Sequence, residues 1–120
     1  MSQRREFVRL KGKRPVLMYI GRDRQPIRSY AVDLAGGGLL LAGPDVLRIG
    51  EQIEFQLTLS PESEPVVGVG TVVRSDVEGH RAIAFSEMSD LNRRRVVRFI
   101  FERERAERRR MLEADERDGG

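Results

Sequence analysis

The sequence predicts a mainly β fold, a six-stranded antiparallel β-barrel followed by one long C-terminal α-helix. Three observations predict it. The chain has 120 residues, the length of one domain with a single core. Before residue 89 it holds six short apolar segments separated by turns rich in Gly, Pro and Ser, which is typical of small barrels. After residue 89 the apolar residues change to the three-to-four-residue period of a helix.

The strand assignments depend on apolar patterning. The sequence "IEFQLTL" at residues 53–59 alternates strictly between apolar and polar side chains, as a half-buried strand does. Residues 38–43 are predicted to form a short strand that is buried on both faces. Gly68 and Gly70 indicate a bend or a close approach within their strand. The six strands are expected at residues 15–20, 29–34, 38–43, 51–59, 66–76 and 80–85.

The helix is expected over residues 89–118, with Ser89 as its N-terminal cap. Its early turns carry apolar side chains on one face, which should cover one end of the barrel. Beyond residue 101 the helix is mostly charged, with pairs such as Glu104 and Arg108 at the spacing that stabilises an exposed helix. A solvated helix is favoured here over a coiled coil. The apolar face contains Val96, Val97, Ile100 and Phe101.

Charge is segregated along the chain. Residues 1–28 contain 9 basic and 2 acidic residues, whereas residues 29–88 contain 3 basic and 9 acidic residues. We therefore expect a basic flexible arm at residues 1–14, a barrel at 15–88 and the helix at 89–118. Such an arm suits an anionic partner, although a purely solvated arm would have the same composition.

Composition argues against an enzyme. There is no cysteine, and His80 is the one histidine, so neither a thiolate metal site nor a histidine-based catalytic set is expected. No phosphate-loop or dinucleotide motif accompanies the glycines, so no cofactor or metal is predicted. His80 is expected to be a surface residue beside a turn. With no apolar run near the length of a membrane span, we expect a cytoplasmic protein.

Two motifs identify a family resemblance. The sequence "RREFVR" at residues 4–9 contains an R-x-x-x-R pattern, and "DLAGGG" at residues 33–38 contains D-x-A-x-x-G. In this order these motifs resemble those of the PilZ domain, whose second pattern is [D/N]-x-S-x-x-G. The C-terminal segment is similar to the helix of PilZ proteins of the flagellar-brake type. The resemblance implies a PilZ-type barrel that receives cyclic di-GMP, a bacterial second messenger, on its outer surface.

The chemistry of these residues agrees with that ligand. Arginine can bind phosphate oxygens or the O6 and N7 edge of guanine, and an aspartate can accept hydrogen bonds from guanine N1 and N2. Glycines allow the ligand to approach the backbone, and Gly38 is also expected to supply the turn into the next strand. Alanine replaces the motif serine at position 35, which is expected to weaken binding. The candidate ligand residues are Arg4, Arg5, Arg9, Asp33, Ala35, Gly37, Gly38 and Arg74.

Each assignment has a structural alternative. Asp33 could cap a turn, and residues 36–38 could be only a tight turn. The resemblance implies that Arg74 stacks on the ligand, but it could be an ordinary strand residue. The last basic residues of the arm are expected to raise the local potential without specific contacts: Lys11, Lys13 and Arg14.

The resemblance implies a receptor that orders its arm over cyclic di-GMP and signals to an unidentified protein that controls motility, pili or exopolysaccharide. Arg4 beside Arg5 leaves room for a second cationic contact, and the resemblance implies that such a doubled arginine accompanies an intercalated dimer of the ligand. One alternative is a ligand-silent adaptor that acts by protein contact. A nucleic-acid-binding barrel is disfavoured, because Phe7 is the one aromatic residue of the arm.

Overall fold

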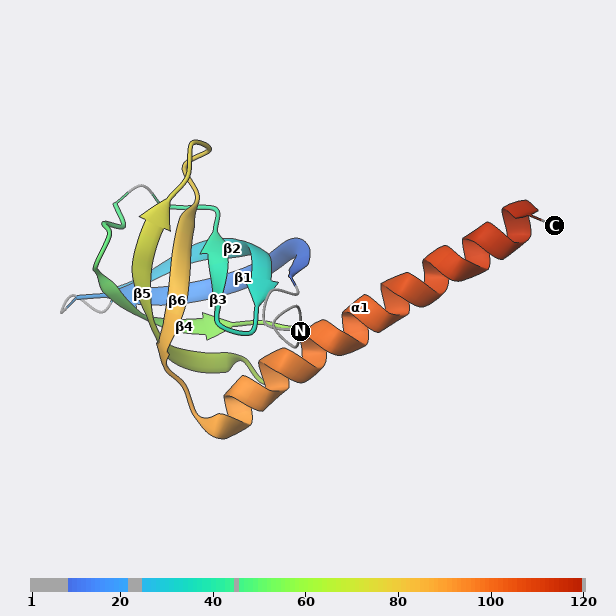
Figure 1. Cartoon of the computed structure of the whole chain (residues 1–120). Coiled ribbons are helices and arrows are strands. Elements are labelled where there is room, and N and C mark those ends of the chain that lie inside the picture. Colours follow the sequence, from blue (N-terminus) through green and yellow to red (C-terminus); the bar gives the residue numbers. More distant parts are fainter. Residues whose placement is uncertain (1–8, 22–24, 45, 120) are drawn as a thin grey trace, which may run out of the picture.

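The computed structural model describes residues 9–21, 25–44 and 46–119, with the side chains of the helix described as far as residue 114. Within these residues, six antiparallel strands close into a barrel and one helix follows them (Figure 1). The strand order around the barrel is β1-β2-β3-β6-β5-β4, and pairing of β1 with β4 closes it. The predicted fold class is confirmed. The elements are β1 Leu10–Ile20, β2 Pro26–Ala35, β3 Gly38–Leu41, β4 Gln52–Leu57, β5 Val66–Ser75, β6 Arg81–Glu87 and α1 Asp90–Gly119.

Strand β1 begins five residues before the predicted start of the barrel at residue 15. Leu10 pairs with Leu34 of β2 and is buried, so it belongs to the core. Gly12 has a φ of 132°, within an irregularity of the pairing between Lys11 and Arg14. Glycine suits this bulge because other residues rarely adopt that conformation. Lys11, Lys13 and Arg14 therefore lie in a strand, while residues 1–8 of the predicted arm lie outside the described residues.

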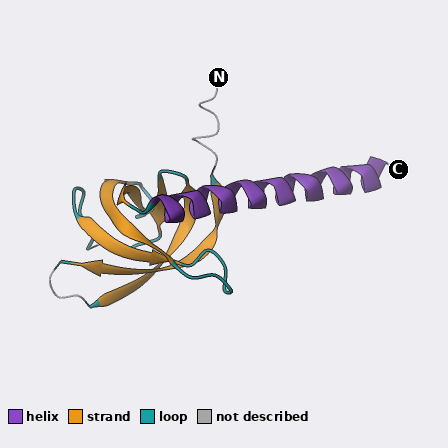
Figure 2. Cartoon of the chain, turned by 90° about the horizontal axis from the view of Figure 1, so that it is seen from below, coloured by secondary structure: helices purple, strands orange, loops and turns teal. Residues whose placement is uncertain are grey.

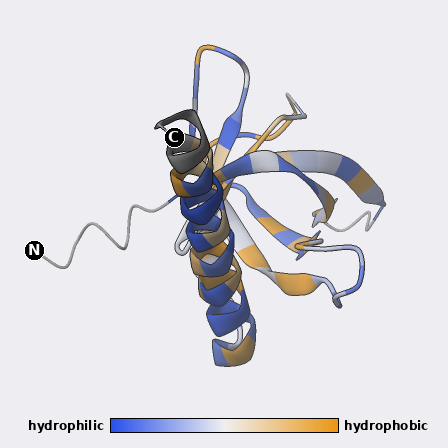
Figure 3. Cartoon of the chain, turned by 90° about the vertical axis from the view of Figure 1, so that its right-hand side faces the viewer, coloured by the Kyte–Doolittle hydropathy of each residue, from blue (hydrophilic) through white to orange (hydrophobic). Residues whose placement is uncertain are grey.

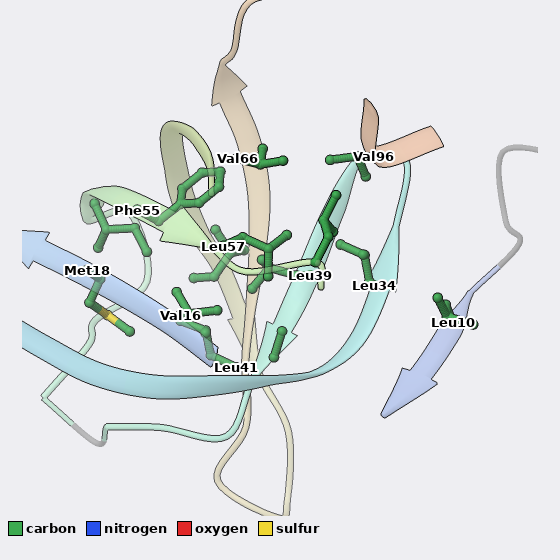
Figure 4. Close-up of a cluster of buried hydrophobic side chains, with 14 of the residues drawn as sticks. Leu10, Val16, Met18, Leu34, Leu39, Leu41, Phe55, Leu57, Val66 and Val96 are labelled. Carbon is green, nitrogen blue, oxygen red and sulfur yellow. The ribbon is translucent and has the colours of Figure 1, made fainter. Parts of the chain in front are cut away.

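The barrel interior is filled by side chains from alternate positions of the strands (Figure 4). In β4, Ile53, Phe55 and Leu57 are each at most 2% exposed, which confirms the alternation. In β3, however, only Leu39 and Leu41 are buried among the leucines, and the side chain between them faces outward. The prediction that this strand is buried on both faces is therefore wrong. A short apolar run does not reveal by itself whether one face or both are covered.

Strand β5 carries valines on both its inner and its outer face. Val66 and Val72 are buried in the core, whereas Val67 and Val73 lie half exposed on the outer face. A Cβ atom at Gly70 would overlap the side chain of a buried isoleucine of β6. The expected close approach is therefore confirmed, and glycine at this position allows two strands to pack without a void or a clash.

Helix α1 begins as predicted. The hydroxyl of Ser89 accepts a hydrogen bond from the backbone N–H of Asn92 at 3.1 Å, and the Ser89 carbonyl accepts one from the N–H of Arg93 at 2.9 Å. Both are contacts of an N-terminal cap. Val96 and Ile100 of the next turns are buried with the barrel core. The apolar face of the helix therefore docks on the barrel.

A cation–π cluster extends this docking. The guanidinium carbons of Arg14 and Arg103 lie 5.2 and 5.1 Å from the centre of the Phe99 ring. Burial lowers the pKa of Arg14, the neighbouring Arg103 lowers it further, and Glu107 opposes both. Arg14 thus links β1 to α1, and the expectation that it makes no specific contact is wrong. The sequence pattern did not predict this contact, because the Phe99 ring is distant from Arg14 along the chain.

The remainder of α1 projects away from the barrel (Figures 1 and 2). Its surface is mainly hydrophilic (Figure 3). The expected pair forms, with Arg108 donating to the Glu104 carboxylate at 2.6 Å. Over its described residues, α1 contains no apolar stretch long enough to cross a membrane.

Candidate ligand-binding site

A pocket of about 240 Å³ lies on the outer face of the barrel, where β2, β3, β5 and β6 meet. Most of the strand residues that line it point away from the core, and the buried Leu34, Leu39 and Ile83 also contribute to its lining. Part of the pocket lining is apolar and includes Leu40, Val73 and Ala84. The pocket brings together the predicted site residues that the structure describes: Arg9, Asp33, Ala35, Gly37, Gly38 and Arg74.

Asp33 is the acceptor of the pocket. Its side chain is 15% exposed, and its Oδ2 lies 3.6 Å from the guanidinium of Arg9, which is 55% exposed. Its Oδ1 is buried and has no hydrogen-bond partner among the described residues. Buried carboxylate oxygens ordinarily accept hydrogen bonds, so this oxygen is an unused acceptor at the pocket wall.

The glycines between β2 and β3 have different roles. A Cβ at Gly37 would have no heavy atom within 4 Å, so this turn leaves open space beside the pocket. A Cβ at Gly38 would instead overlap the backbone carbonyl oxygen of Ile83, because Gly38 pairs with Ala84 of β6. The backbone of Gly37 also accepts a hydrogen bond from the N–H of Phe85 at 2.9 Å. Gly38 is therefore required by strand packing, whereas Gly37 is free to face a ligand.

Arg74 reaches the pocket from β5. The pairing between β5 and β6 shifts between Val72 and Arg74, so that Arg74 is placed opposite Ala82. Arg74 is exposed, and both residues line the pocket. A guanidinium in this place can lie over a planar ligand or contact a phosphate. The position fits the predicted stacking role, which stays a prediction.

The apolar walls were absent from the predicted site. Leu40, Val73 and Ala84 point outward from three different strands and converge only through the strand pairing. No alternation marks Leu40 as an outward position, because it lies within a run of three leucines. Which of the outward positions lie side by side depends on strand order and register.

Comparison with known proteins identifies the fold family. The family model described as the PilZ domain matches residues 3–102. The chain belongs to the PilZ domain family. No curated protein sequence matches it.

Solved structures share this PilZ fold. The inhibitor of motility MotI/DgrA of Bacillus subtilis aligns with a TM-score of 0.70 and 19% identity over 84% of this chain, which spans only 51% of that protein. The PilZ domain of YcgR from Escherichia coli, solved with c-di-GMP, aligns with a TM-score of 0.64 and 17% identity, and the alignment covers 86% of this chain and 93% of that one. The PilZ domain of CeSA from a cellulose-synthesizing bacterium aligns with a TM-score of 0.60 and 17% identity, and the alignment covers 80% of this chain and 97% of that one. At these low identities, the TM-scores establish a shared fold and nothing more.

Two predicted ligand residues of this PilZ domain, Arg4 and Arg5, lie outside the described residues. Ala35 ends β2 at the pocket, where the motif of the family would place a serine hydroxyl. The methyl group of alanine can neither donate nor accept a hydrogen bond. The pocket therefore has one polar contact fewer than the family pattern predicts.

A second hollow adjoins the PilZ pocket near the β5–β6 turn, where Asp76, Glu78 and His80 gather. The Asp76 carboxylate accepts hydrogen bonds from the backbone N–H of His80 and of Glu78, each at 2.9 Å, and contacts His80 Nδ1 at 3.1 Å. Burial would raise the pKa of Asp76, but these backbone donors and the imidazole together lower it. The atom types suit a divalent cation, yet closure of the turn accounts for their arrangement.

Proposed function

We propose that this PilZ domain binds cyclic di-GMP in the pocket and passes the signal to a protein partner. The observation that carries the proposal is the buried, unused Oδ1 of Asp33 beside Arg9 and Arg74. Adjacent N1 and N2 donors of a guanine match the two oxygens of one carboxylate, and this pairing would satisfy the unused acceptor.

The arginines would complete the recognition of the ligand. A guanidinium can bind the O6 and N7 edge of guanine or fork onto a phosphate, so Arg9 and Arg74 suit both ends of the ligand. The Arg9–Asp33 pair is 3.6 Å apart and half exposed on the arginine side, so it contributes at most about 1 kcal/mol. A ligand could therefore displace Arg9 from Asp33 at low cost.

The arm would close over the bound ligand and contribute Arg4 and Arg5. Two adjacent arginines can serve the two phosphates of one molecule, and the family resemblance of this doubled arginine supports an intercalated dimer as well. Closure would change the surface beside the pocket, and that change is the signal to the partner. This scheme makes the chain a binding module with no catalytic step and no cofactor.

A second candidate is an adaptor that acts by protein contact without the ligand, and Ala35 favours it. A missing neutral hydrogen bond typically costs about 0.5 to 1.5 kcal/mol, which weakens binding by a factor of about 2 to 13. We infer weakened binding rather than none, because Arg9, Asp33 and Arg74 all line the same pocket.

Calorimetric titration of the full chain with cyclic di-GMP tests the proposal, with cyclic di-AMP and GTP as competitor controls. We expect saturable binding whose stoichiometry distinguishes one ligand from two. Asp33→Ala and Arg5→Ala should each weaken binding at least about tenfold, since each removes charge-assisted hydrogen bonds. Arg28→Ala is the matched control, because Arg28 is exposed on β2 outside the pocket.

Ala35→Ser gives the complementary test, because it restores the hydroxyl of the family motif. Its affinity should rise by a factor of about 2 to 13. Absence of heat with every nucleotide, for the parent chain and for Ala35→Ser alike, would reject the receptor and favour the adaptor.

A further inference from the structure

A groove of about 660 Å³ runs along the first turns of α1. It is separate from the ligand pocket, and no residue lines both. The described residues that line it combine four guanidinium groups with two aliphatic side chains: Leu91, Arg93, Arg94, Arg95, Val97 and Arg98.

The positive charge of this groove is largely uncompensated. Within the described part of the chain, Arg93 and Arg94 form no ion pair or side-chain hydrogen bond, and both are exposed. The Arg98 side chain is 82% exposed and lies 3.6 Å from Glu102, an exposed pair that binds weakly. Leu91 is 63% exposed and adds apolar surface to the groove. A surface of this kind suits a partner that offers carboxylates together with an apolar side chain.

Hydrogen bonds fix the same turns to the barrel, and one of the residues that form them, Arg95, also lines the groove. Asn92 donates to the backbone carbonyl of Val67 at 3.3 Å, and Arg95 donates to the Asn92 side chain at 2.9 Å and to the backbone carbonyl of Glu64. Together with the buried contacts of the helix, these bonds hold the groove in one orientation. A partner would then bind without a large ordering cost in this chain.

We propose that this groove binds an acidic segment of a partner protein, one that presents Asp or Glu residues around one or two apolar side chains. Charge complementarity selects the acid groups, and Leu91 and Val97 receive the apolar ones. A nucleic acid fits less well, because the described residues that line the groove include no aromatic side chain on which a base could stack. A lipid surface also fits less well, because Leu91 is the one large apolar side chain that is exposed among the described residues lining the groove.

The groove also adjoins the turn of the ligand pocket. The Cγ2 atom of Val97 lies 3.6 Å from the position that a Cβ on Gly36 would occupy. Val97 lines the groove, and Gly36 precedes the pocket residues Gly37 and Gly38. The inference that this partner receives the nucleotide signal rests on the proposed function, whereas acidic-segment binding itself does not.

Selection of short random peptides on the full chain tests the inference. We expect selected peptides to be enriched in Asp and Glu with Leu, Ile or Phe between them. Fluorescence polarisation of one labelled peptide should then show binding that weakens at least about tenfold in an Arg94→Glu, Arg98→Glu double variant, since like charges face the peptide. The matched control is Arg105→Glu with Arg109→Glu, which makes the same charge change farther along α1 and should change affinity less than about twofold.

Titrations of a polyuridine RNA and of phosphatidylglycerol vesicles complete the test, with thermal melts to confirm that each variant is folded. Three results would each overturn the proposal. The first is a set of selected peptides without acidic enrichment, and the second is an equal loss of peptide affinity in the groove variant and the control variant. The third is RNA or vesicle binding that is tighter than peptide binding and that the groove variant abolishes. Each titration is run with and without cyclic di-GMP. If the chain binds the peptide but no nucleotide, only the proposed function is rejected. If it binds the nucleotide but no peptide, only the proposal for the groove is rejected.

Discussion

Replacing Asp33 with alanine should stabilise the free protein while it weakens ligand binding. The buried Oδ1 of Asp33 lacks a partner among the described residues, and an unpaired buried acceptor costs about 1 to 3 kcal/mol. Its Oδ2 forms a partly exposed pair with Arg9 at 3.6 Å, which contributes at most about 1 kcal/mol. Removing both leaves a net gain of about 0 to 3 kcal/mol in the free energy of unfolding. For a chain of this length each kcal/mol raises Tm by about 4 °C.

Urea denaturation and thermal melts of the ligand-free protein measure this gain, and calorimetry measures the loss of affinity. Asp76→Ala is the matched control, because its carboxylate accepts hydrogen bonds at 2.9 Å from two backbone N–H groups. That variant should lower the free energy of unfolding without changing nucleotide affinity.

One outcome of the Asp33→Ala measurement would refute this reasoning. If Asp33→Ala lowered the free energy of unfolding by more than about 1 kcal/mol, the carboxylate would be satisfied in the folded state and would act as the turn cap that the sequence also allows. The assignment of Asp33 as a ligand acceptor would then lose its physical basis.

Three further predictions concern single positions. Gly38→Ala should lower the free energy of unfolding by at least about 2 kcal/mol in urea denaturation, because its Cβ would overlap a backbone carbonyl of β6, whereas Gly37→Ala should leave stability unchanged. Phe99→Ala should cost about 2 kcal/mol in the same assay, and Phe99→Leu about 1 kcal/mol, since leucine keeps apolar contact but loses the two cation–π contacts. The pKa of Asp76 is lowered because hydrogen bonds outweigh burial, so its stabilising contribution is complete above the ordinary carboxyl range and is lost as the pH falls through the folded pKa. The stability difference between the parent chain and Asp76→Asn should therefore shrink between about pH 7 and pH 3, and a constant difference would contradict this reasoning.

The barrel and the helix were predictable because their signals are local. Alternation from Ile53 to Leu57 shows which face of β4 is buried, and Ser89 marks the start of α1 by its own cap. The beginning of β1 was missed because charged outward residues surround the buried Leu10. A strand whose exposed positions are all basic has the composition of a solvated arm, and only pairing with Leu34 distinguishes the two.

The candidate site was predictable where the sequence resembles the motifs of the family. Arg9, Asp33 and Arg74 were assigned from that resemblance, with which their donor and acceptor groups agree, and the pocket does bring them together. The reason for Gly38 could not be found in the sequence, because it depends on a carbonyl of Ile83, 45 positions away. The same holds for Leu40, whose outward direction follows from its pairing with β6.

These constraints separate the residues that hold the fold from those that would select the ligand. Asp33 and Arg74 point outward and contribute nothing to the buried core, so changes at these positions can alter binding without loss of the barrel. Alanine at position 35 is tolerated for the same reason, because it ends a strand at the pocket rim. Gly38 is different, since it lines the pocket and also allows β3 to approach β6. A PilZ chain can therefore lose the serine of its motif and keep its fold, whereas loss of this glycine would damage the fold and the pocket together.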